Sequence, residues 1–367
     1  MKPIVRKIIS ALLLLTFAYL SASQRSNGSM QLSSVQTEYT EKEPERIPET
    51  EMPIPVSSGA DEAEVEVPEQ IPPSLDPKPE YTFPDDFTTQ LLPPDWFEES
   101  LSPGSVETVE YPATDYRSGK EIVKQMDVYL PFGYTPEIQY DVLILTHGAG
   151  SDESYWFSED HEYGGEKVNA KNLVDNMIFR KACRPLIIAS VTCTNEVSCS
   201  GKAYNWDQLL LDGYQLSREI AEDILPFLAE HYSTHAAGSG SAALSQARDH
   251  FAYFGLSWSA MFGYLAILPE NMDYFSWYAL IAPSKVNISG KMDTISEKNE
   301  SFPIHALYAG VGSKDQVRAE SEAIYSSLIR NGTFSDGGNA FQVITKNVNH
   351  HFESWCTSLY NCLLLFF

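Results

Sequence analysis

Six short apolar runs recur between residues 141 and 347 of this 367-residue chain, and they constrain its fold more than any other feature. They read DVLILTH, PLIIASV, FAYFGLS, YALIAPS, IHALYAG and FQVITKN. Short continuous runs of this kind are typical of strands buried in a parallel sheet. Helical stretches fall between them, including NAKNLVDNMIFRK, GYQLSREIAEDILPFLAEHY and QVRAESEAIYSSLIRNG, with further helices expected from about Ala260 and Phe352. The alternation predicts one α/β domain with a mostly parallel central sheet and helices on both faces.

Two segments ahead of these runs have a different pattern. ETVEYPAT and IVKQMDVYLP alternate between polar and apolar residues, which favours an antiparallel pair of strands at the start of the domain. The helical stretch 213–232 carries an apolar stripe of the kind that lies on a sheet, formed by Ile220, Ile224, Phe227 and Leu228. We expect the folded domain to span residues 101–367.

The first 23 residues have the order of a secretory signal. Lys2, Arg6 and Lys7 precede the apolar run IISALLLLTFAYL, and the small residues Ser21 to Ser23 follow it. A membrane span needs about 20 apolar residues, and this run is shorter. We therefore expect residues 1–23 to be cleaved, with no stable membrane span afterwards, and the mature protein to be secreted or at the cell surface. An uncleaved anchor is the alternative.

Residues 24–100 differ in composition from the rest of the chain. Between residues 31 and 100 there are 18 Asp and Glu against 3 Lys and Arg, together with 12 of the 22 prolines. Prolines interrupt hydrogen-bonded structure and like charges extend a chain, so this segment is expected to be a disordered spacer. An acidic binding tail is the alternative interpretation.

Charge and cysteine content limit the possible partners. Residues 101–367 carry a net charge of −14, which repels phosphate backbones, so no nucleic acid partner is expected. The odd count of five cysteines leaves at least one thiol unpaired within the chain, although Cys193 and Cys199 flank a short loop and could close it. No cysteine pair has zinc-site spacing, so no metal is expected.

The stretch FGLSWSAMFG places Ser257 at the end of one apolar run and before an expected helix. Gly255-Leu256-Ser257-Trp258-Ser259 is a G-x-S-x-G motif with serine in the last position. In a nucleophile elbow the serine has strained backbone geometry, and its neighbours must be small because strand and helix pass closely. Gly255 meets this requirement, and we expect the side chain of Ser259 to be accommodated.

Three other strand ends carry side chains or amides that a serine nucleophile needs. His147-Gly148-Ala149-Gly150 follows DVLILT, and the amides of Gly148 and Ala149, with that of Trp258, are candidates to bind an oxyanion. Asp315 follows IHALYAG, and His350 and His351 follow FQVITKN. A nucleophile, an acid and a base thus occur in the order found in α/β-hydrolases.

The region from about Asp127 to Phe367 resembles the esterase family that includes the feruloyl and acetylxylan esterases of carbohydrate esterase family 1. Its H-G-x-G-x-x-E-x-x-W motif is matched over His147 to Trp156, its G-T-x-D motif by GSKD ending at Asp315, and its G-H-D-W-x-x-W motif by NHHFESW. Aligning the last motif on Trp355 makes His350 the base.

The resemblance implies an α/β-hydrolase fold and ester hydrolysis by Ser257, His350 and Asp315 without a cofactor. Four positions depart from the usual motifs, which have glycine for Ser259, methionine for Trp258, glycine for Asn349 and an acidic residue for His351.

The substrate expected from the resemblance is a plant cell-wall polysaccharide ester or a small ester. Trp156, Trp206 and Trp258 are candidates to stack on an aromatic acyl group or a sugar, although most aromatic residues of such a domain are core. Two alternatives remain open. One is an acyltransferase of the same fold, and the other is a non-catalytic glycan-binding surface protein with a decayed esterase pocket.

Overall fold

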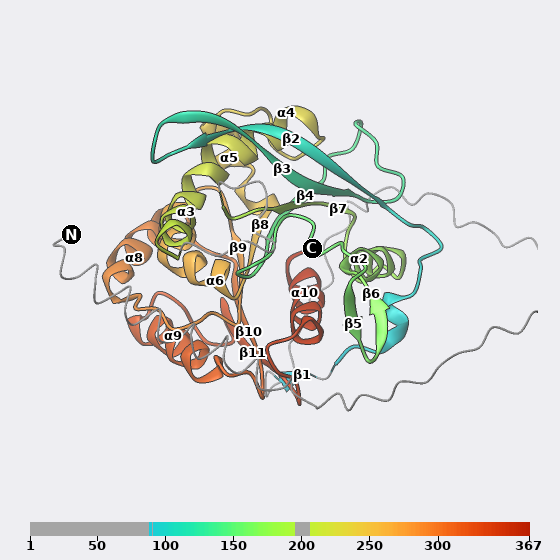
Figure 1. Cartoon of the computed structure of the whole chain (residues 1–367). Coiled ribbons are helices and arrows are strands. Elements are labelled where there is room, and N and C mark those ends of the chain that lie inside the picture. The colour runs from blue at the N-terminus through green and yellow to red at the C-terminus, as the bar shows by residue number, and fades with distance from the viewer. Residues whose placement is uncertain (1–87, 90, 195–205) are drawn as a thin grey trace, which may run out of the picture. The chain divides into compact units, whose positions relative to one another are not determined.

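The computed structural model describes residues 88–89, 91–194 and 206–367, and the side chains of Thr88 and of residues 206–211 lie outside this description. Within it, nine strands form one sheet in the order β1-β11-β10-β9-β8-β4-β7-β3-β2 (Figure 1). The strands are β1 (Thr88–Thr89), β2 (Ser105–Asp115), β3 (Lys120–Leu130), β4 (Asp141–Thr146), β7 (Leu186–Val191), β8 (Phe251–Leu256), β9 (Trp277–Ile281), β10 (Ala306–Gly312) and β11 (Ala340–Thr345).

Only the β2 end of the sheet is antiparallel. β2 pairs with β3, and β3 with β7, in antiparallel register, whereas every other pair of neighbours is parallel. The predicted α/β fold with an antiparallel opening pair is confirmed. Strands β4, β7 and β8 are buried along their whole length, which is why their sequences are apolar on both faces.

Helices cover both faces of the sheet (Figure 1). Helices α2 and α10 lie on one side, and α3, α6 and α9 on the other. The bounds of the helices are α2 (Ala170–Phe179), α3 (Trp206–Glu219), α4 (Leu225–His231), α5 (Ser241–Gln246), α6 (Trp258–Phe262), α7 (Leu268–Glu270), α8 (Met292–Ser301), α9 (Arg318–Asn331) and α10 (Phe352–Phe366). Short 3-10 turns occur at η1 (Pro94–Phe97), η3 (Arg248–His250) and η5 (Ser289–Lys291).

The long helix predicted over residues 213–232 is confirmed, but it contains a wider turn. A π-helical segment, η2 (Ile220–Ile224), joins α3 to α4, and a second one, η4 (Gly263–Ile267), joins α6 to α7. A proline follows each segment at the second position of the next helix, Pro226 and Pro269. Because proline has no amide hydrogen, a regular α-helical bond is missing at both places.

The folded part begins before the predicted boundary at residue 100. Leu92 and Phe97 are buried, and the Tyr163 hydroxyl donates to the Leu92 carbonyl at 3.0 Å. The Asn176 side chain of α2 donates to the carbonyls of Trp96 and Glu98. Residues 92–98, which were predicted to belong to the spacer, therefore pack against the domain. Their partners Tyr163 and Asn176 are about 70–80 residues away in sequence, so no local pattern indicated these contacts. Residues 1–87 lie outside the described residues.

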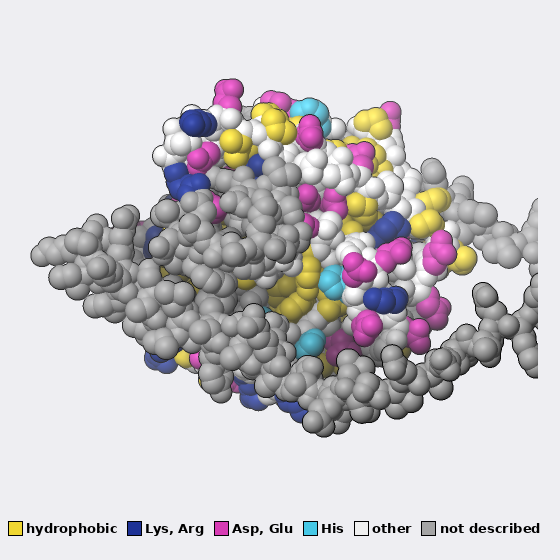
Figure 2. All heavy atoms as spheres, in the orientation of Figure 1, with side chains coloured by type: hydrophobic (Ala, Val, Ile, Leu, Met, Phe, Trp, Pro, Cys, Tyr) yellow, Lys and Arg dark blue, Asp and Glu magenta, His cyan; other side chains and the backbone are white. Residues whose placement is uncertain are grey.

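The rest of the described chain adds a small hairpin and an acidic surface. Strands β5 (His161–Tyr163) and β6 (Glu166–Val168) form a separate antiparallel pair that the sequence analysis did not predict. Acidic side chains are spread over the face around this hairpin, where Glu159, Glu162 and Glu166 are exposed (Figure 2).

In the part of the chain that the structure describes, none of the helices has the length and the apolar composition that a membrane span requires.

Candidate active site

Ser257 lies on a sharp turn between β8 and α6, and its backbone is strained. Its φ and ψ angles are 52° and −106°, which cost a non-glycine residue about 1–3 kcal/mol. Two backbone hydrogen bonds hold the turn, from Ser257 N–H to the Ile281 carbonyl at 2.8 Å and from Met261 N–H to the Ser257 carbonyl at 3.2 Å. A Cβ atom at Gly255 would lie 3.0 Å from the Ala260 Cα atom, so this position needs glycine. The turn has the geometry of a nucleophile elbow.

Ser259, where the motif usually has glycine, is fully buried and hydrogen-bonded. Its hydroxyl accepts from the Leu256 amide at 2.9 Å and donates to the Leu256 carbonyl at 3.0 Å. The Thr146 hydroxyl of β4 lies 2.8 Å away. The serine side chain therefore fits without leaving a buried polar atom unpaired, and it links the elbow to the neighbouring strand.

His350 joins Ser257 to Asp315 across three strand ends. Its Nε2 atom lies 3.0 Å from Ser257 Oγ, and its Nδ1 atom lies 2.8 Å from Asp315 Oδ2. A carboxylate can only accept, so Nδ1 carries the proton and Nε2 can accept the serine proton. The structure thus brings together the three residues that the sequence analysis singled out as nucleophile, acid and base.

The second carboxylate oxygen of Asp315 has its own partner. Asp315 Oδ1 accepts a hydrogen bond from the Val317 amide at 2.9 Å, just before α9. The two oxygens of Asp315 therefore have different partners, which fixes the orientation of the carboxylate toward His350. His351 is exposed and stands directly before α10, whereas His350 is partly buried and faces the serine.

The loop after β4 lies against the elbow. A Cβ atom at Gly148 would lie 3.5 Å from the Ser257 Cβ atom, so the loop backbone runs beside the serine. The ring of His147 holds this loop, because its Nδ1–H donates to the Gly148 carbonyl at 2.7 Å and its Nε2 accepts from the Cys193 amide at 3.2 Å. Burial lowers the pKa of His147 to about 4, so the imidazole is neutral at pH 7.

A buried ion pair is connected to the same loop through the residues that follow β7. Lys124 Nζ of β3 lies 2.6 Å from Glu219 Oε1 of α3, and the two side chains are 2% and 5% exposed. The Tyr111 hydroxyl donates to the same glutamate oxygen, and Lys124 also donates to the Thr192 carbonyl at 3.1 Å. The next amide, Cys193 N–H, is the one that holds His147. A continuous set of buried polar contacts therefore runs from the ion pair to the loop beside Ser257.

Glu153 and Trp156, which match the Glu and Trp of the H-G-x-G-x-x-E-x-x-W motif, anchor the far side of this loop. The Glu153 carbonyl accepts from the Ser190 hydroxyl at 2.6 Å, and Trp156 Nε1–H donates to the Thr146 carbonyl at 3.1 Å. Trp156 is fully buried among core aromatic residues. The prediction that Trp156 stacks on the substrate is therefore wrong, because its indole has no exposed surface on which a ligand could stack.

The other predicted substrate-contacting residues have different positions. Trp258 is almost completely buried and packs edge-on against Phe262. Trp206 begins α3, but its side chain lies outside the described residues. The ring of Trp355, in contrast, packs edge-on against the catalytic candidate His350, with centroids 5.1 Å apart. Tyr155 adjoins Trp355 at 6.2 Å.

Sequence reasoning missed several residues of the site. Lys124 and Glu219 appear in the sequence as ordinary charged positions, and Thr146 as the polar end of an apolar strand. The only signal was that Lys124 interrupts an apolar face of β3, which is weak evidence by itself. Cys193 is a buried residue whose pKa is raised to about 12 by burial, and its predicted partner Cys199 lies outside the described residues.

The chain is similar over about half of its length to a bacterial xylanase. Over 200 residues it is 28% identical to endo-1,4-beta-xylanase Y of Acetivibrio thermocellus, which is 52% of this chain but only 16% of that protein. The chain thus corresponds to a small part of the xylanase. No protein-family model matches it.

Solved structures give the same relationship. The feruloyl esterase module from Clostridium thermocellum complexed with sinapinate has a TM-score of 0.65 at 20% identity, covering 78% of this chain and 96% of the module. The ferulic acid esterase of Anaeromyces mucronatus in complex with ferulic acid has a TM-score of 0.56 at 18% identity, covering 78% and 96%. The resemblance predicted from the motifs is confirmed, and at these identities it shows the α/β-hydrolase fold.

Proposed function

We propose that this chain is a serine esterase that hydrolyses ester groups on plant cell-wall polysaccharide. The observation that carries the proposal is the hydrogen-bonded array of Ser257, His350 and Asp315 on a strained elbow. Strain at a non-glycine residue persists only where the surrounding structure enforces it, and here it projects a hydroxyl toward an imidazole. The similarity to solved feruloyl esterases supports the same chemistry.

Each group of the array has one role in the proposed mechanism. His350 Nε2 takes the proton of the Ser257 hydroxyl as the oxygen attacks the ester carbonyl carbon, and a tetrahedral intermediate forms. The imidazolium keeps its Nδ1–H hydrogen bond to Asp315 and passes the proton on Nε2 to the departing alcohol. The product of this step is an acyl-enzyme. Water, deprotonated by His350, then attacks the acyl carbon. The bond between this carbon and Ser257 Oγ breaks, the imidazolium returns its proton to Ser257, and the acid is released.

The negative charge of the intermediate needs amide donors near Ser257. Trp258 N–H is in the first turn of α6, where amides have no acceptor within the helix. The amides of Gly148 and Ala149 are the proposed second source, because the loop that carries them runs beside the serine. His147 keeps the Gly148 carbonyl bonded to its ring, so this carbonyl is not available to point at the oxyanion.

The acyl group in the proposal is feruloyl or acetyl. Trp355 packs against His350, and Tyr155 adjoins Trp355, so the two rings could offer aromatic surface for a cinnamoyl ring. The two structural relatives bound to sinapinate and ferulic acid support the aromatic acyl group. Export of the mature protein is proposed from the signal-like residues 1–23, which also suits an insoluble polymeric substrate.

Two of the departures from the usual motifs, Ser259 and His351, are the residues that would favour the glycan-binding alternative. Ser259 is accommodated by hydrogen bonds, and His351 is an exposed residue that takes no part in the array. Neither residue now favours a decayed site. Acyl transfer to a sugar would use the same acyl-enzyme, and only the acceptor differs.

The test uses the full chain with methyl ferulate, an aryl acetate and acetylated xylan, together with a serine-directed phosphonate probe. We expect hydrolysis and covalent labelling of wild type, and neither with Ser257→Ala. Added free sugar should leave the yield of free acid unchanged, whereas a new sugar ester would show transfer. Absence of both labelling and hydrolysis in the folded wild type would refute the proposal.

A further inference from the structure

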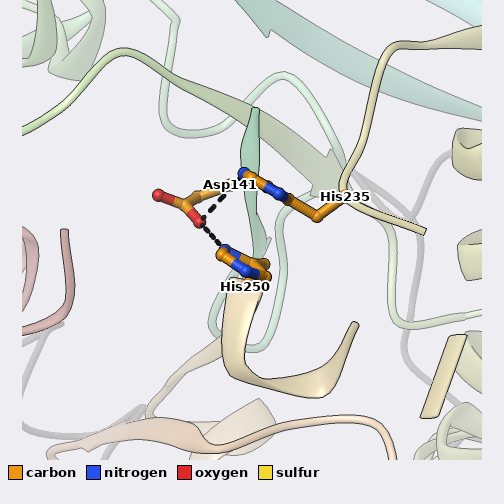
Figure 3. A group of neighbouring side chains, drawn as sticks. All are labelled: Asp141, His235 and His250. Carbon is orange, nitrogen blue, oxygen red and sulfur yellow. Dashed lines mark hydrogen bonds and ion pairs between the residues drawn. The ribbon is translucent and has the colours of Figure 1, made fainter. Parts of the chain in front are cut away.

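A second group of ionisable side chains lies at the opposite end of the sheet from Ser257. Asp141 is the first residue of β4, His250 directly precedes β8, and His235 follows Thr234, which bridges Tyr140 (Figure 3). His250 Nδ1 lies 2.7 Å from Asp141 Oδ1, and His235 Nε2 lies 3.8 Å from the same oxygen. Three segments that are distant in sequence therefore converge on one carboxylate oxygen.

The carboxylate of Asp141 is held in a fixed orientation. Its other oxygen, Oδ2, accepts from Arg184 Nε at 3.1 Å and from the terminal nitrogen of Arg184 at 2.7 Å. Oδ1 is therefore the oxygen that faces the two imidazoles.

We propose that Asp141, His235 and His250 form a binding site for a divalent transition-metal ion of the Zn²⁺ type. The three candidate ligand atoms all lie within 4.8 Å of one another. Ligand atoms about 2.0–2.1 Å from a tetrahedral Zn²⁺ are separated by about 3.3 Å, which lies between the two distances from Asp141 Oδ1. One carboxylate and two imidazoles are a common ligand set for such ions, and water would complete the coordination.

Binding requires a limited rearrangement. The rings of His235 and His250 are stacked, with centroids 3.5 Å apart and planes 10° from parallel. An ion lies in the plane of each ring that binds it, so one ring must turn out of the stack. The side chains are 26% and 39% exposed, which leaves them room to turn.

Arg184 contributes as an outer partner of the site. It neutralises part of the carboxylate charge, which weakens the attraction for a cation, but it also fixes the oxygen that points at the imidazoles. The site is separated from Ser257 by the full length of β8, about 20 Å. The ion would therefore act by joining three segments and stabilising the fold, and it takes no part in the proposed ester chemistry.

The test measures thermal unfolding of the full chain, freed of metal with a chelator, with and without Zn²⁺. A ligand that binds only the folded state raises the unfolding temperature, so we expect a Zn²⁺-dependent rise in wild type. The rise should disappear in His235→Ala and His250→Ala and persist in His231→Ala, whose imidazole is exposed on α4 and lies outside the cluster. Co²⁺ should give the visible absorption of a four-coordinate ion in wild type and in His231→Ala only.

A further variant separates loss of the ligand from loss of structure. His250→Asn keeps a side-chain donor toward Asp141 but lacks the imidazole ligand. We expect its unfolding temperature without metal to stay near that of wild type, and its Zn²⁺ affinity to fall by more than about 10-fold. An absent response in wild type, or an equal response in all variants, would overturn the proposal. Because the readout is unfolding and not hydrolysis, its outcome is independent of the proposed esterase activity.

Discussion

Each end of the central sheet holds a histidine hydrogen-bonded to a buried aspartate, and the two bonds have nearly the same length. At the carboxyl end of the strands His350 Nδ1 lies 2.8 Å from Asp315, and at the amino end His250 Nδ1 lies 2.7 Å from Asp141. The difference is in the third partner. His350 faces the hydroxyl of Ser257, whereas Asp141 binds an arginine and faces a second imidazole.

The comparison shows that a histidine–aspartate pair does not by itself indicate catalysis. In a parallel sheet the helix that follows each strand starts at the carboxyl end, so free amides of a first helical turn are found there. Ser257 has this environment, with the Trp258 amide next to it. Among the described residues, no nucleophile on a strained turn lies at the amino end, and the charges of Asp141 and Arg184 satisfy one another.

The largest effect is expected from substitutions of the candidate catalytic residues at the carboxyl end of the strands. Ser257→Ala, Asp315→Asn and His350→Ala should each lower kcat for ester hydrolysis by about 10⁴-fold, because the three residues act as a unit. For the same reason, the double variants should lose far less than the product of the single losses. His351→Ala is the matched control and should remain active, and steady-state kinetics would show the reverse if His351 were the base.

Breaking the buried ion pair below the loop should affect both stability and rate. Lys124→Met leaves the buried charge of Glu219 without its partner, which typically costs about 3–5 kcal/mol. We expect kcat to fall more than KM rises, because the Thr192 carbonyl loses the donor that positions the His147 contact. Urea denaturation and ester kinetics measure the two effects.

The control for the ion pair is the exposed pair formed by Arg218 and Glu222. Its side chains are 55% and 52% exposed, so Arg218→Ala should change stability by less than about 1 kcal/mol. The double variant Lys124→Met with Glu219→Leu should recover much of the stability lost in the single variant. If the double variant does not recover stability, the hydrogen bonds of Lys124 and Glu219 to Thr192 and Tyr111 contribute to stability beyond the neutralisation of charge.

Protonation of His147 should make the stability of the fold depend on pH. Its pKa is about 4 in the folded state against an ordinary value of 6.5, so the unfolded chain binds the proton first as pH falls. Stability should be complete above pH about 6.5 and decrease toward pH about 4, by about 3 kcal/mol in total. His147→Asn keeps a donor toward Gly148 but does not titrate, and denaturation at several pH values should give a correspondingly flatter profile.

Breaking the amino end should affect stability alone. Asp141→Asn removes the charge that Arg184 and His250 share, and because both partners are partly exposed we expect a loss of about 2 kcal/mol. In chelator-treated protein kcat should be unchanged, since the cluster is about 20 Å from Ser257. A large fall in kcat in the folded variant would show that the two ends of the sheet are coupled.

The smallest effect concerns the serine inside the elbow. Ser259→Gly leaves the buried Leu256 amide without its side-chain acceptor, so we expect a loss of about 1 kcal/mol in stability. The rate of hydrolysis should change little, because Ser257, His350 and the loop amides are untouched. Calorimetry and phosphonate labelling test this, and a strong gain in labelling would show that Ser259 obstructs the natural turn.

The sequence alone determined the sheet and the positions of the site residues along it. Apolar runs of strand length and amphipathic stripes are local patterns, and the carboxyl ends of parallel strands meet at one edge whatever the loops do. Ser257, Asp315 and His350 each follow such a run, so their convergence could be expected before any contact was known.

The tertiary structure decided the features that depend on pairs far apart in the chain. Thr146 and Ser259 are 113 residues apart, and Asp141 and His250 are 109 apart, so no local pattern announces either contact. The early start of the domain, the burial of Trp156 and the ion pair of Lys124 have the same origin. A polar residue in an apolar segment indicates that some partner exists, but only the packing of distant segments supplies the partner and its geometry.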